Sequence, residues 1–238
     1  MKKVVLVVVL SLCLLITIQA FAAEKPRVGV LRFTNHTGAG WWGYTSGTEL
    51  QDMLIAELAS TEAFRVLERK ELDKVISEQK LSESGLVDET TRVKPGKIKG
   101  AQYLIAATVS AFQENTSGSD AGISVMGFNV GGSKKTAYMA VDLKVIDTQT
   151  GEIVKTRTIE ATSEGSGLHL SGHVGFLCGN LGKQEKTPVG KAIRACVIEI
   201  SEYLECSMVI QNEECMKKYG EKEKKRKAKT KKAITLDE

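Results

Sequence analysis

Hydrophobic and polar residues alternate along several stretches of the chain, and a period of two predicts β-strands. The stretches with this pattern, or with a short apolar run of strand length, are residues 27–34, 64–67, 103–109, 137–146 and 152–162. The turn Asp147–Gly151 separates the last two, so we expect them to form a hairpin.

Apolar residues spaced three or four positions apart follow the first two strands and predict helices. One helix begins at Ser46 or Thr48, either of which could cap it, and a second covers Glu71–Leu81. A weaker helical segment begins at Asp88 and is interrupted by a Pro-Gly pair. A closing helix, Val189–Leu204, follows the last strand, with a proline in its first turn. This order of strands and helices predicts an α/β layer architecture.

Two glycine-containing, charge-poor inserts, residues 112–135 and 163–182, lie at the ends of the long antiparallel strands. They are either flexible surface loops or functional segments, because loops of this length are uncommon in a compact domain. Their apolar residues favour the second interpretation, since exposed apolar residues at this density need a partner surface.

A lipid bilayer is one such partner surface. Strands cross a bilayer only as a closed barrel, in which about ten alternating residues span the membrane. Two hairpins supply four strands, and four strands cannot close around anything. A ring of subunits, each donating its hairpins to a shared barrel, would solve this problem.

Residues 167–179, in the second insert, alternate with period two, like a strand with one apolar and one polar face. The residues that we expect to face lipid are Leu168, Leu170, Val174 and Phe176. The residues that we expect to face a water-filled lumen are His169, Ser171 and His173. The first insert alternates poorly, because Ile123 and Val125 have one parity whereas Met126, Phe128 and Val130 have the other.

Residues 1–22 have the form of a secretory signal peptide, which predicts an exported protein. Two lysines precede an apolar run, Val4–Ile18, and Ala20-Phe21-Ala22 is a cleavage site. An uncleaved anchor helix is the alternative, although the run is short for a membrane span. Cys13 follows a bulky leucine where a lipoprotein signal needs a small residue, so we predict no lipidation.

The formal net charge of +4 is unevenly distributed. Residues 217–232 hold ten lysines and arginines against two glutamates, a net charge of +8. Subtracting this +8, and the +2 of the two signal-peptide lysines, from +4 leaves −6 for the rest of the chain. We expect the tail to be a solvated, disordered or frayed helical end; contact with anionic lipid or a partner is the alternative. We expect no nucleic-acid partner for an exported chain.

Four cysteines follow the signal peptide, in a compartment that permits disulfides, and their spacing is not that of a zinc site. They are Cys178, Cys196, Cys206 and Cys215. Cys206 and Cys215 both lie near the end of the domain, so we expect this pair to be joined. Buried free thiols and the other connectivities stay open.

Enzyme chemistry has little support. His169 and His173 would lie about 13 Å apart along a strand, which does not suit a metal site. His36 stands alone in a loop, and the chain has neither a G-x-S-x-G nor a GxGxxG motif. We therefore predict no catalytic residue, no metal and no cofactor.

The chain resembles the curli-secretion channel family (CsgG/HfaB) of outer-membrane export proteins. The matching stretches cover most of residues 27–205 and are RVGVLRFTNHTG, FRVLERKELDKVISEQKLSESGLVD, GAQYLIAATVSAF, DLKVIDTQTGEIVKTRTIEA and TPVGKAIRACVIEISEYL. The lipid-anchoring cysteine of the family is missing, the loop after the first strand is shorter, and the basic tail is additional.

The resemblance implies a periplasmic α/β sandwich domain with two inserted β-hairpins that form an oligomeric transmembrane β-barrel. The domain would be residues 23–205, the hairpins about 112–135 and 155–182, and residues 206–238 a C-terminal segment with the basic tail. Unfolded curli-like fibre subunits would diffuse through this outer-membrane pore, with accessory assembly proteins as further partners.

In that family, the loop after the first strand lines a narrow constriction. The corresponding loop here, residues 38–47, offers Trp41, Trp42 and Tyr44 for that role. Packing of the two tryptophans against the domain is the alternative. A soluble periplasmic interaction module, which partners or activates envelope assembly machinery, is the second interpretation of the whole chain.

Overall fold

One mixed sheet organises the computed structural model, which describes residues 24–118, 123–125, 128–170 and 187–233. Its strands are β1 (Arg27–Val30), β2 (Thr34–Asn35), β3 (Arg65–Val66), β4 (Tyr103–Gly118), β5 (Ile123–Val125), β6 (Phe128–Asp147) and β7 (Ile153–Leu170). Strand β1 runs parallel to both β3 and β4, whereas β4, β6 and β7 are antiparallel neighbours with β6 in the middle. The α/β class predicted from the sequence is confirmed.

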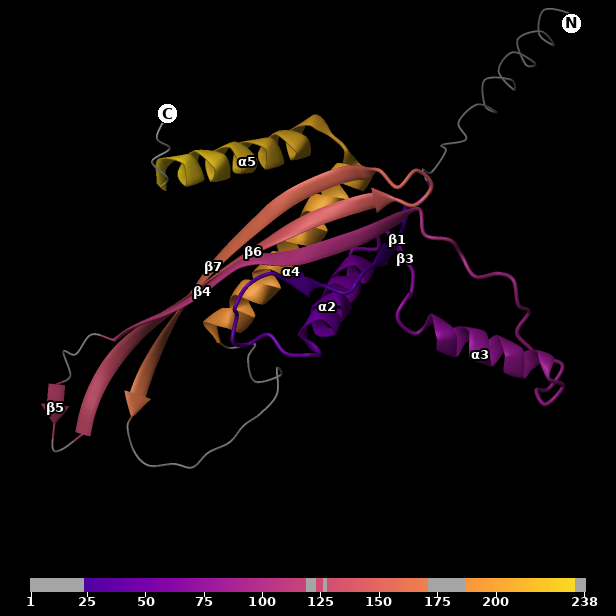
Figure 1. Cartoon of the computed structure of the whole chain (residues 1–238), viewed down its shortest axis with the longest axis horizontal. Coiled ribbons are helices and arrows are strands. Elements are labelled where there is room, and N and C mark those ends of the chain that lie inside the picture. Colours follow the sequence, from indigo (N-terminus) through magenta and orange to yellow (C-terminus); the bar gives the residue numbers. More distant parts are fainter. Residues whose placement is uncertain (1–23, 119–122, 126–127, 171–186, 234–238) are drawn as a thin grey trace, which may run out of the picture.

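Helices α2 (Ser46–Ser60) and α4 (Pro188–Glu205) cover one face of this sheet. The other described helices are α3 (Leu72–Glu83) and α5 (Glu213–Ala233), and a π-helical turn, Cys206–Ile210, joins α4 to α5. Figure 1 shows α2 and α4 against one face of the sheet, α5 beside β7, and α3 set apart from the strands.

The core lies between the sheet and the helices α2 and α4. Buried residues alternate along β6, at Val141, Leu143 and Val145, and they continue the period-two pattern of the sequence. Leucines of α2 and α4, such as Leu54 and Leu204, pack against them and are fully buried. Each such side chain contributes about 1.5–3 kcal/mol through its removal from water.

The closing helix and the hairpin turn have the local signals that predicted them. Pro188 occupies the first turn of α4, and the Thr187 side chain accepts a hydrogen bond from the Gly190 N–H at 3.1 Å. In the turn between β6 and β7, Asp147 Oδ1 accepts hydrogen bonds from two following backbone N–H groups. Gly151 has a φ of 77°, a conformation that glycine adopts without strain.

Two predicted elements differ in the structure. The strand predicted over residues 27–34 is divided into β1 and β2, because the Phe33 N–H donates to the Gly47 carbonyl instead of to a strand. The helical segment predicted from Asp88 is wrong. Asp88 Oδ1 accepts hydrogen bonds from the N–H and the hydroxyl of Thr90, which closes a turn in place of a helix.

The start of α2 also differs in detail. The helix begins at Ser46, but no side chain caps it. The Ser46 hydroxyl instead accepts a hydrogen bond from the Gly43 N–H, at 2.8 Å, and so holds the end of the preceding loop.

Candidate functional site

Strands β4, β6 and β7 continue beyond the helices as a three-stranded extension, which we call the ribbon. A contact with a helix lies near the start of this extension, where the Ser163 hydroxyl donates to the Pro188 carbonyl at the start of α4. The residues beyond that level are Glu114–Gly118, Ile123–Val125, Phe128–Ala137 and Ser163–Leu170. Figure 1 shows these strands leaving the helix-covered body.

The register of the ribbon is continuous on both sides of β6. Ala137 pairs with Glu114 and Ser163, and Ser133 pairs with Gly118 and Gly167. The described part of β7 ends at Leu170, which pairs with Val130. Residues 155–170 of the second predicted hairpin are therefore strand, and residues 171–182 lie outside the described part of the chain.

Strand β5 explains the broken alternation of the first insert. It pairs back onto β6, with Val125 opposite Phe128 and Ile123 opposite Val130. Residues directly opposite one another in an antiparallel pair share a face. The change of parity between Val125 and Phe128 thus marks a reversal of the chain.

The two faces of the outer part of the ribbon, from Ser133 to its far end, consequently differ in composition. One face contains Ile123, Val125, Phe128, Val130, Leu168 and Leu170. The opposite face contains Ser124, Asn129, Gly131, Ser133, Gly167 and His169. Nearer the body, the face of Val130 continues with Lys134 and Thr136, opposite Ser166 and Glu164. Only the second face continues the row of buried β6 residues that packs on α2 and α4.

Both outer edges of the ribbon lack a strand partner among the described residues. Strand β2 pairs with β4 only at Thr108 and Val109. A bulge in β4 follows Val109, and beyond it the edge of β4 that faces away from β6 has no strand partner among the described residues. Strand β7 pairs with β6 alone. Unpaired edges of this kind can add a strand from another chain.

An aromatic loop, residues 36–45, lies at the base of the ribbon. The Trp41 ring packs edge-on against Phe112 of β4, with 5.7 Å between centroids, and against Trp42 at 5.4 Å. Phe112 pairs with the buried Met139, so the loop lies on the face that carries α2 and α4. Tyr44 is 89% exposed.

The position of this loop is fixed at both ends. Asn35 Oδ1 accepts hydrogen bonds from the N–H and hydroxyl of Thr37, which starts a tight turn. At the other end, a Cβ on Gly47 would lie 2.4 Å from the Phe33 carbonyl oxygen, so only glycine fits there. Arg32 donates to the Tyr44 carbonyl, and its guanidinium lies 5.4 Å from the centre of the Tyr44 ring.

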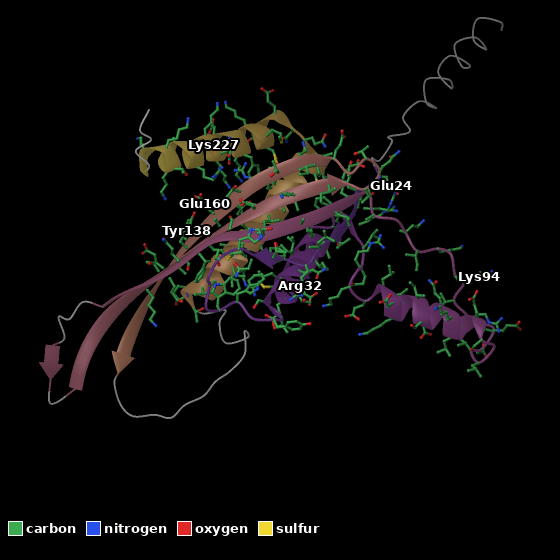
Figure 2. The ribbon with its side chains drawn as sticks, viewed as in Figure 1. Glu24, Arg32, Lys94, Tyr138, Glu160 and Lys227 are labelled. Atoms are coloured by element: carbon green, nitrogen blue, oxygen red, sulfur yellow. A yellow bond between two sulfur atoms is a disulfide. The ribbon has the colours of Figure 1, made fainter. Side chains whose placement is uncertain are left out.

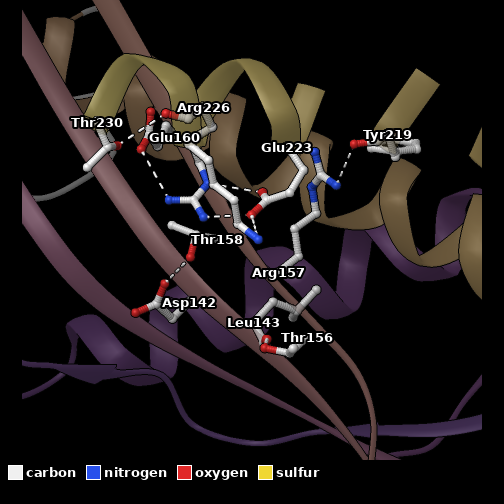
Figure 3. Close-up of polar contacts among 11 residues, drawn as sticks. Asp142, Leu143, Thr156, Arg157, Thr158, Glu160, Tyr219, Glu223, Arg226 and Thr230 are labelled. Atoms are coloured by element: carbon white, nitrogen blue, oxygen red, sulfur yellow. Dashed lines mark hydrogen bonds and ion pairs between the residues drawn. The ribbon is translucent and has the colours of Figure 1, made fainter. Parts of the chain in front are cut away.

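Helix α5 covers the edge of β7 within the body. Arg157 of β7 donates to the Tyr219 carbonyl at 3.0 Å, and its guanidinium lies about 5 Å from the rings of both Tyr203 and Tyr219, which pack edge-on against each other at 5.3 Å. Further along, Arg226 lies 4.0 Å from Glu160 and pairs with Glu223 at 2.7 Å (Figure 3). The tail is thus a continuous helix with one side docked, not the frayed or disordered end predicted from its charge.

Electrostatics at this contact favour the charged forms of Glu223 and Arg226. The hydrogen bond from Arg226 holds the pKa of Glu223 below its ordinary value, and Glu223 in turn raises the pKa of Arg226. Burial raises the pKa of Tyr138, and the neighbouring Glu160 carboxylate raises it further. Figure 2 shows these two residues near each other on the sheet.

The cysteines of the C-terminal part have different states. Cys206 and Cys215 form a disulfide, with 5.9 Å between their Cα atoms, and so join the end of α4 to the start of α5. Cys196 is a buried free thiol in α4, and burial raises its pKa to about 12.

The sequence-predicted site residues are brought together only in part. Trp41 and Trp42 lie at the base of the ribbon that contains Leu168, His169 and Leu170. Four further predicted residues lie outside the described ranges; they are Ser171, His173, Val174 and Phe176. Sequence reasoning missed the docking of α5, although Tyr219, Glu223, Arg226 and Thr230 recur at helical spacing within the basic tail.

No group of three or more His, Cys, Asp or Glu residues in the described part of the chain could hold a metal ion. None of the described helices has both the length and the apolar composition needed to cross a bilayer.

Comparison with known proteins gives one extended sequence match. The family model "Curli production assembly/transport component CsgG" matches residues 11–234, which includes α5. No curated protein matches the chain.

Solved structures show only distant likeness. A hypothetical protein from Chlamydia trachomatis is 14% identical with a TM-score of 0.43, covering 76% of this chain and 96% of that one. A lipoprotein from Neisseria meningitidis is 13% identical with a TM-score of 0.34, covering 74% and 98%. A PelC dodecamer from Paraburkholderia phytofirmans is 12% identical with a TM-score of 0.31, covering 74% and 84%. Likeness at this level says nothing about what the chain binds or how it assembles.

Proposed function

The chain belongs to the CsgG family of curli production assembly/transport components, and from that premise we propose that it is a subunit of an outer-membrane export channel. Its subunits form a ring, and each donates its ribbon to a shared transmembrane β-barrel. Unfolded curli-like fibre subunits leave by diffusion through this pore, with accessory assembly proteins as partners. The family is one of transport and assembly, and the proposal involves no catalytic step.

The observation that carries this proposal is the two-faced composition of the ribbon. In the outer part of the ribbon, six apolar residues from β5, β6 and β7 share one face, whereas serine, asparagine, glycine and histidine form the other. A barrel strand needs this arrangement, with lipid on one side and water on the other. The part of β6 beyond the helices, Phe128–Ala137, has ten residues, the length of a strand that crosses a bilayer.

The edges of the ribbon favour a ring. A three-stranded ribbon cannot close on itself, and an open edge is not tolerated in lipid. The edge of β7 is covered by α5 only inside the body, and β4 loses its β2 partner after Val109. Pairing between subunits is therefore available where membrane insertion needs it.

The aromatic loop supports a narrow neck at the base of the pore. Trp41 lies on the same face of the sheet as Phe112 and Met139, and β6 alternation assigns His169 to that face as well. The polar face of the ribbon and the loop are thus on the lumen side of the proposed barrel. Tyr44, the exposed member of the loop, would project towards the passing chain.

Membrane fractionation with crosslinking of the exported protein tests the proposal. We expect the wild-type chain in the outer-membrane fraction as a large oligomer. Replacing Leu168 and Leu170 with lysine should abolish membrane assembly, because a lysine at mid-bilayer costs about 2–4 kcal/mol. The matched control, His169→Lys with Asn129→Lys on the opposite face, should assemble normally.

Two outcomes would overturn this function. A wild-type chain that stays soluble and monomeric would favour an envelope interaction module instead. Normal assembly of the Leu168→Lys, Leu170→Lys variant would show that this face does not meet lipid.

A further inference from the structure

Two charged surfaces lie at opposite edges of the sheet in the body. The strand order there is β3-β1-β4-β6-β7, so the segment after β3 lies at one edge, and α5 covers the other. Figure 1 shows α3 and α5 on opposite sides of the strands. Surfaces at opposite edges of a sheet cannot meet within one chain, but they can meet between two copies arranged head to tail.

The first surface is the segment between β3 and β4, residues 71–99, which we call the arm. Its two ends are held to the body. Lys70 pairs with Asp52 of α2 just before the arm, and Arg69 donates to the Lys99 carbonyl at its end. The large apolar side chains exposed between these ends are Val75, Leu81, Leu86, Val93 and Ile98. Exposed apolar residues at this density indicate a partner surface.

The arm separates its charges along its length. Residues 71–89 hold six acidic residues and two lysines, a net charge of −4, whereas residues 92–99 hold four cations and no acid. Several exposed acidic side chains make no ion pair or hydrogen bond with a described residue; they are Asp73, Glu78, Glu83 and Glu89. The arm thus has an acidic part followed by a basic part.

The second surface is the α4–α5 groove, which consists of two cavities along these helices. The first, of about 550 Å³, is lined by Arg157–Thr162 of β7, Ala195 and Glu199 of α4, and Lys222, Lys225, Arg226 and Lys229 of α5. The second, of about 580 Å³, lies where the two helices join, and its charged lining residues are Glu202, Glu205, Glu214 and Lys218. Glu199 and Glu202, like Lys222 and Lys218, are about one helical turn apart, so the two cavities follow one another.

The unmatched charges of the groove have opposite signs at its two ends. In the first cavity, Lys222 and Arg226 already pair with glutamates. Lys225 and Lys229 make no ion pair or hydrogen bond with a described residue. The second cavity has three glutamates against one lysine. One end of the groove is therefore basic, and the other is acidic.

The acidic end of the groove and the basic part of the arm lie at the same end of the body. Helix α4 begins next to Ser163, where the ribbon starts, so its last turn, with Glu205, lies away from the ribbon. The basic part of the arm leads into β4, whose first residue, Tyr103, pairs with Asp147 at the hairpin turn. This turn is also the end of the body away from the ribbon.

The basic end of the groove and the acidic part of the arm both lie closer to the ribbon. Arg226, which lies between the two free lysines in the sequence, contacts Glu160 near the middle of β7. The acidic part of the arm begins next to Lys70, whose partner Asp52 lies in the middle of α2. Charges of opposite sign thus occur at matching levels on the two edges.

Pairing of the ribbons brings these two edges together. In the proposed barrel, the β7 edge of one subunit meets the β4 edge of the next. In the body, α5 covers β7, and β1 and β3 lie beyond β4, so α5 of one subunit faces the arm side of its neighbour. Rotation about a ring axis along the ribbon leaves the levels of the charges matched.

We propose that the arm of one subunit docks in the α4–α5 groove of a second copy. Its acidic part lies against Lys225 and Lys229, and its basic part lies against Glu205 and Glu214. Its apolar side chains pack on the lysine stems and on Ile210, which lines the second cavity and is 49% exposed. The proposal rests on the proposed ring and names the contact that holds the bodies of its subunits together. The contact requires no lipid, so it can be measured separately from membrane insertion.

Charge reversal tests the contact on the purified full chain, with self-association measured by sedimentation velocity in mild detergent. We expect Lys225→Glu with Lys229→Glu to weaken self-association roughly tenfold, since two ion pairs become two repulsions. Glu78→Lys with Glu89→Lys should weaken it similarly. The chain with all four substitutions should regain most of the loss, because the two reversed surfaces are again complementary.

The matched control is Lys224→Glu with Lys231→Glu. These two exposed lysines lie on the side of α5 opposite Arg226 and outside both cavities. The control changes the net charge by the same amount as the test variant. Self-association should therefore stay within about twofold of wild type.

Cysteine crosslinking tests the position of the contact. A short bismaleimide should join Glu78→Cys of one copy to Lys229→Cys of another and give ladders of oligomers on a denaturing gel. Replacing the second site with Lys231→Cys should abolish the ladder, because residues 229 and 231 point to nearly opposite sides of α5. The single-cysteine variants are further controls.

Four results would overturn the proposal. They are a wild-type chain that does not self-associate, unchanged self-association after charge reversal, no recovery in the combined variant, and equal crosslinking at residue 231. The last three can occur in a chain that assembles in the membrane, and the proposed channel would then stand without this contact. Conversely, crosslinks between residues 78 and 229 in a chain that stays out of the membrane would support the contact and contradict the channel.

Discussion

Arg157 on β7 donates a hydrogen bond to the backbone carbonyl of Tyr219 on α5, and its guanidinium lies 4.9 Å from the centre of the Tyr219 ring. The ring of Tyr203 of α4 lies 5.1 Å from the same guanidinium and packs edge-on against Tyr219. One side chain thus joins the sheet edge to the last two helices.

Replacement of Arg157 with alanine should loosen α5 from the sheet. A hydrogen bond from a charged donor and two cation–π contacts are lost, which we expect to cost about 2 kcal/mol. Hydrogen–deuterium exchange over residues 219–226 would measure the loosening. Arg157→Lys should recover only part of it, because lysine keeps the charge without the planar fork. Lys144→Ala, on an exposed sheet position, should leave the exchange rates unchanged.

Cysteines at Asn115 and Glu164 should crosslink subunits to one another. Both residues flank Thr136 on opposite sides of β6, so within one chain they are separated by two strand spacings, about 9.6 Å. That distance exceeds the reach of a disulfide. We therefore expect oxidised ladders of dimers and larger species on a non-reducing gel. Single-cysteine variants are the controls, and a purely monomeric double variant would contradict pairing between β4 and β7 edges at this level.

Loss of the disulfide should destabilise the attachment of α5. Closing the short loop between Cys206 and Cys215 is expected to contribute about 2–3 kcal/mol. Urea unfolding of the Cys206→Ser, Cys215→Ser variant should therefore have a lower midpoint than that of the oxidised wild type. Reducing agent should lower the wild-type midpoint to the same value and leave the variant unchanged.

Acid should weaken the α5 contact through Glu223. Its pKa is lower in the folded state than its ordinary 4.5, because Arg226 stabilises the carboxylate. This stabilisation is therefore complete above pH 4.5 and is lost as the pH falls through the folded-state pKa. Glu223→Gln should be less stable than wild type at pH 7, and the difference should shrink below pH 4. If the difference in stability between Glu223→Gln and wild type were the same at low pH, the substitution would act through packing and not through the charge of Glu223.

The sequence predicted the elements whose signals are local. Alternation predicted the long strands, and Pro188 predicted the first turn of α4. The aspartate at 147 and the glycine at 151 gave the turn between β6 and β7. Each of these depends on residues within a few positions of one another.

Features that depend on distant partners were missed. The high positive charge of residues 217–232 indicated a solvated tail. The contact of α5 with β7 depends on Arg157 and Glu160, which lie far earlier in the chain. The segment after Asp88 has helical spacing, but the Thr90 contacts of its first residue favour a turn. The reversal between Val125 and Phe128 looked like poor alternation. At a two-residue turn the apolar residues change from odd to even positions, although they stay on the same face of the sheet.

The covering of the β7 edge by α5 has a consequence while the protein is being made. Strand β7 precedes α5 in the chain, so the ribosome and the export machinery deliver the open edge before the helix that shields it. Throughout that interval the edge of β7 is available to any other extended segment nearby. Chains cut short before Glu213 would keep this exposure permanently, and premature termination should therefore yield aggregates instead of merely shortened subunits.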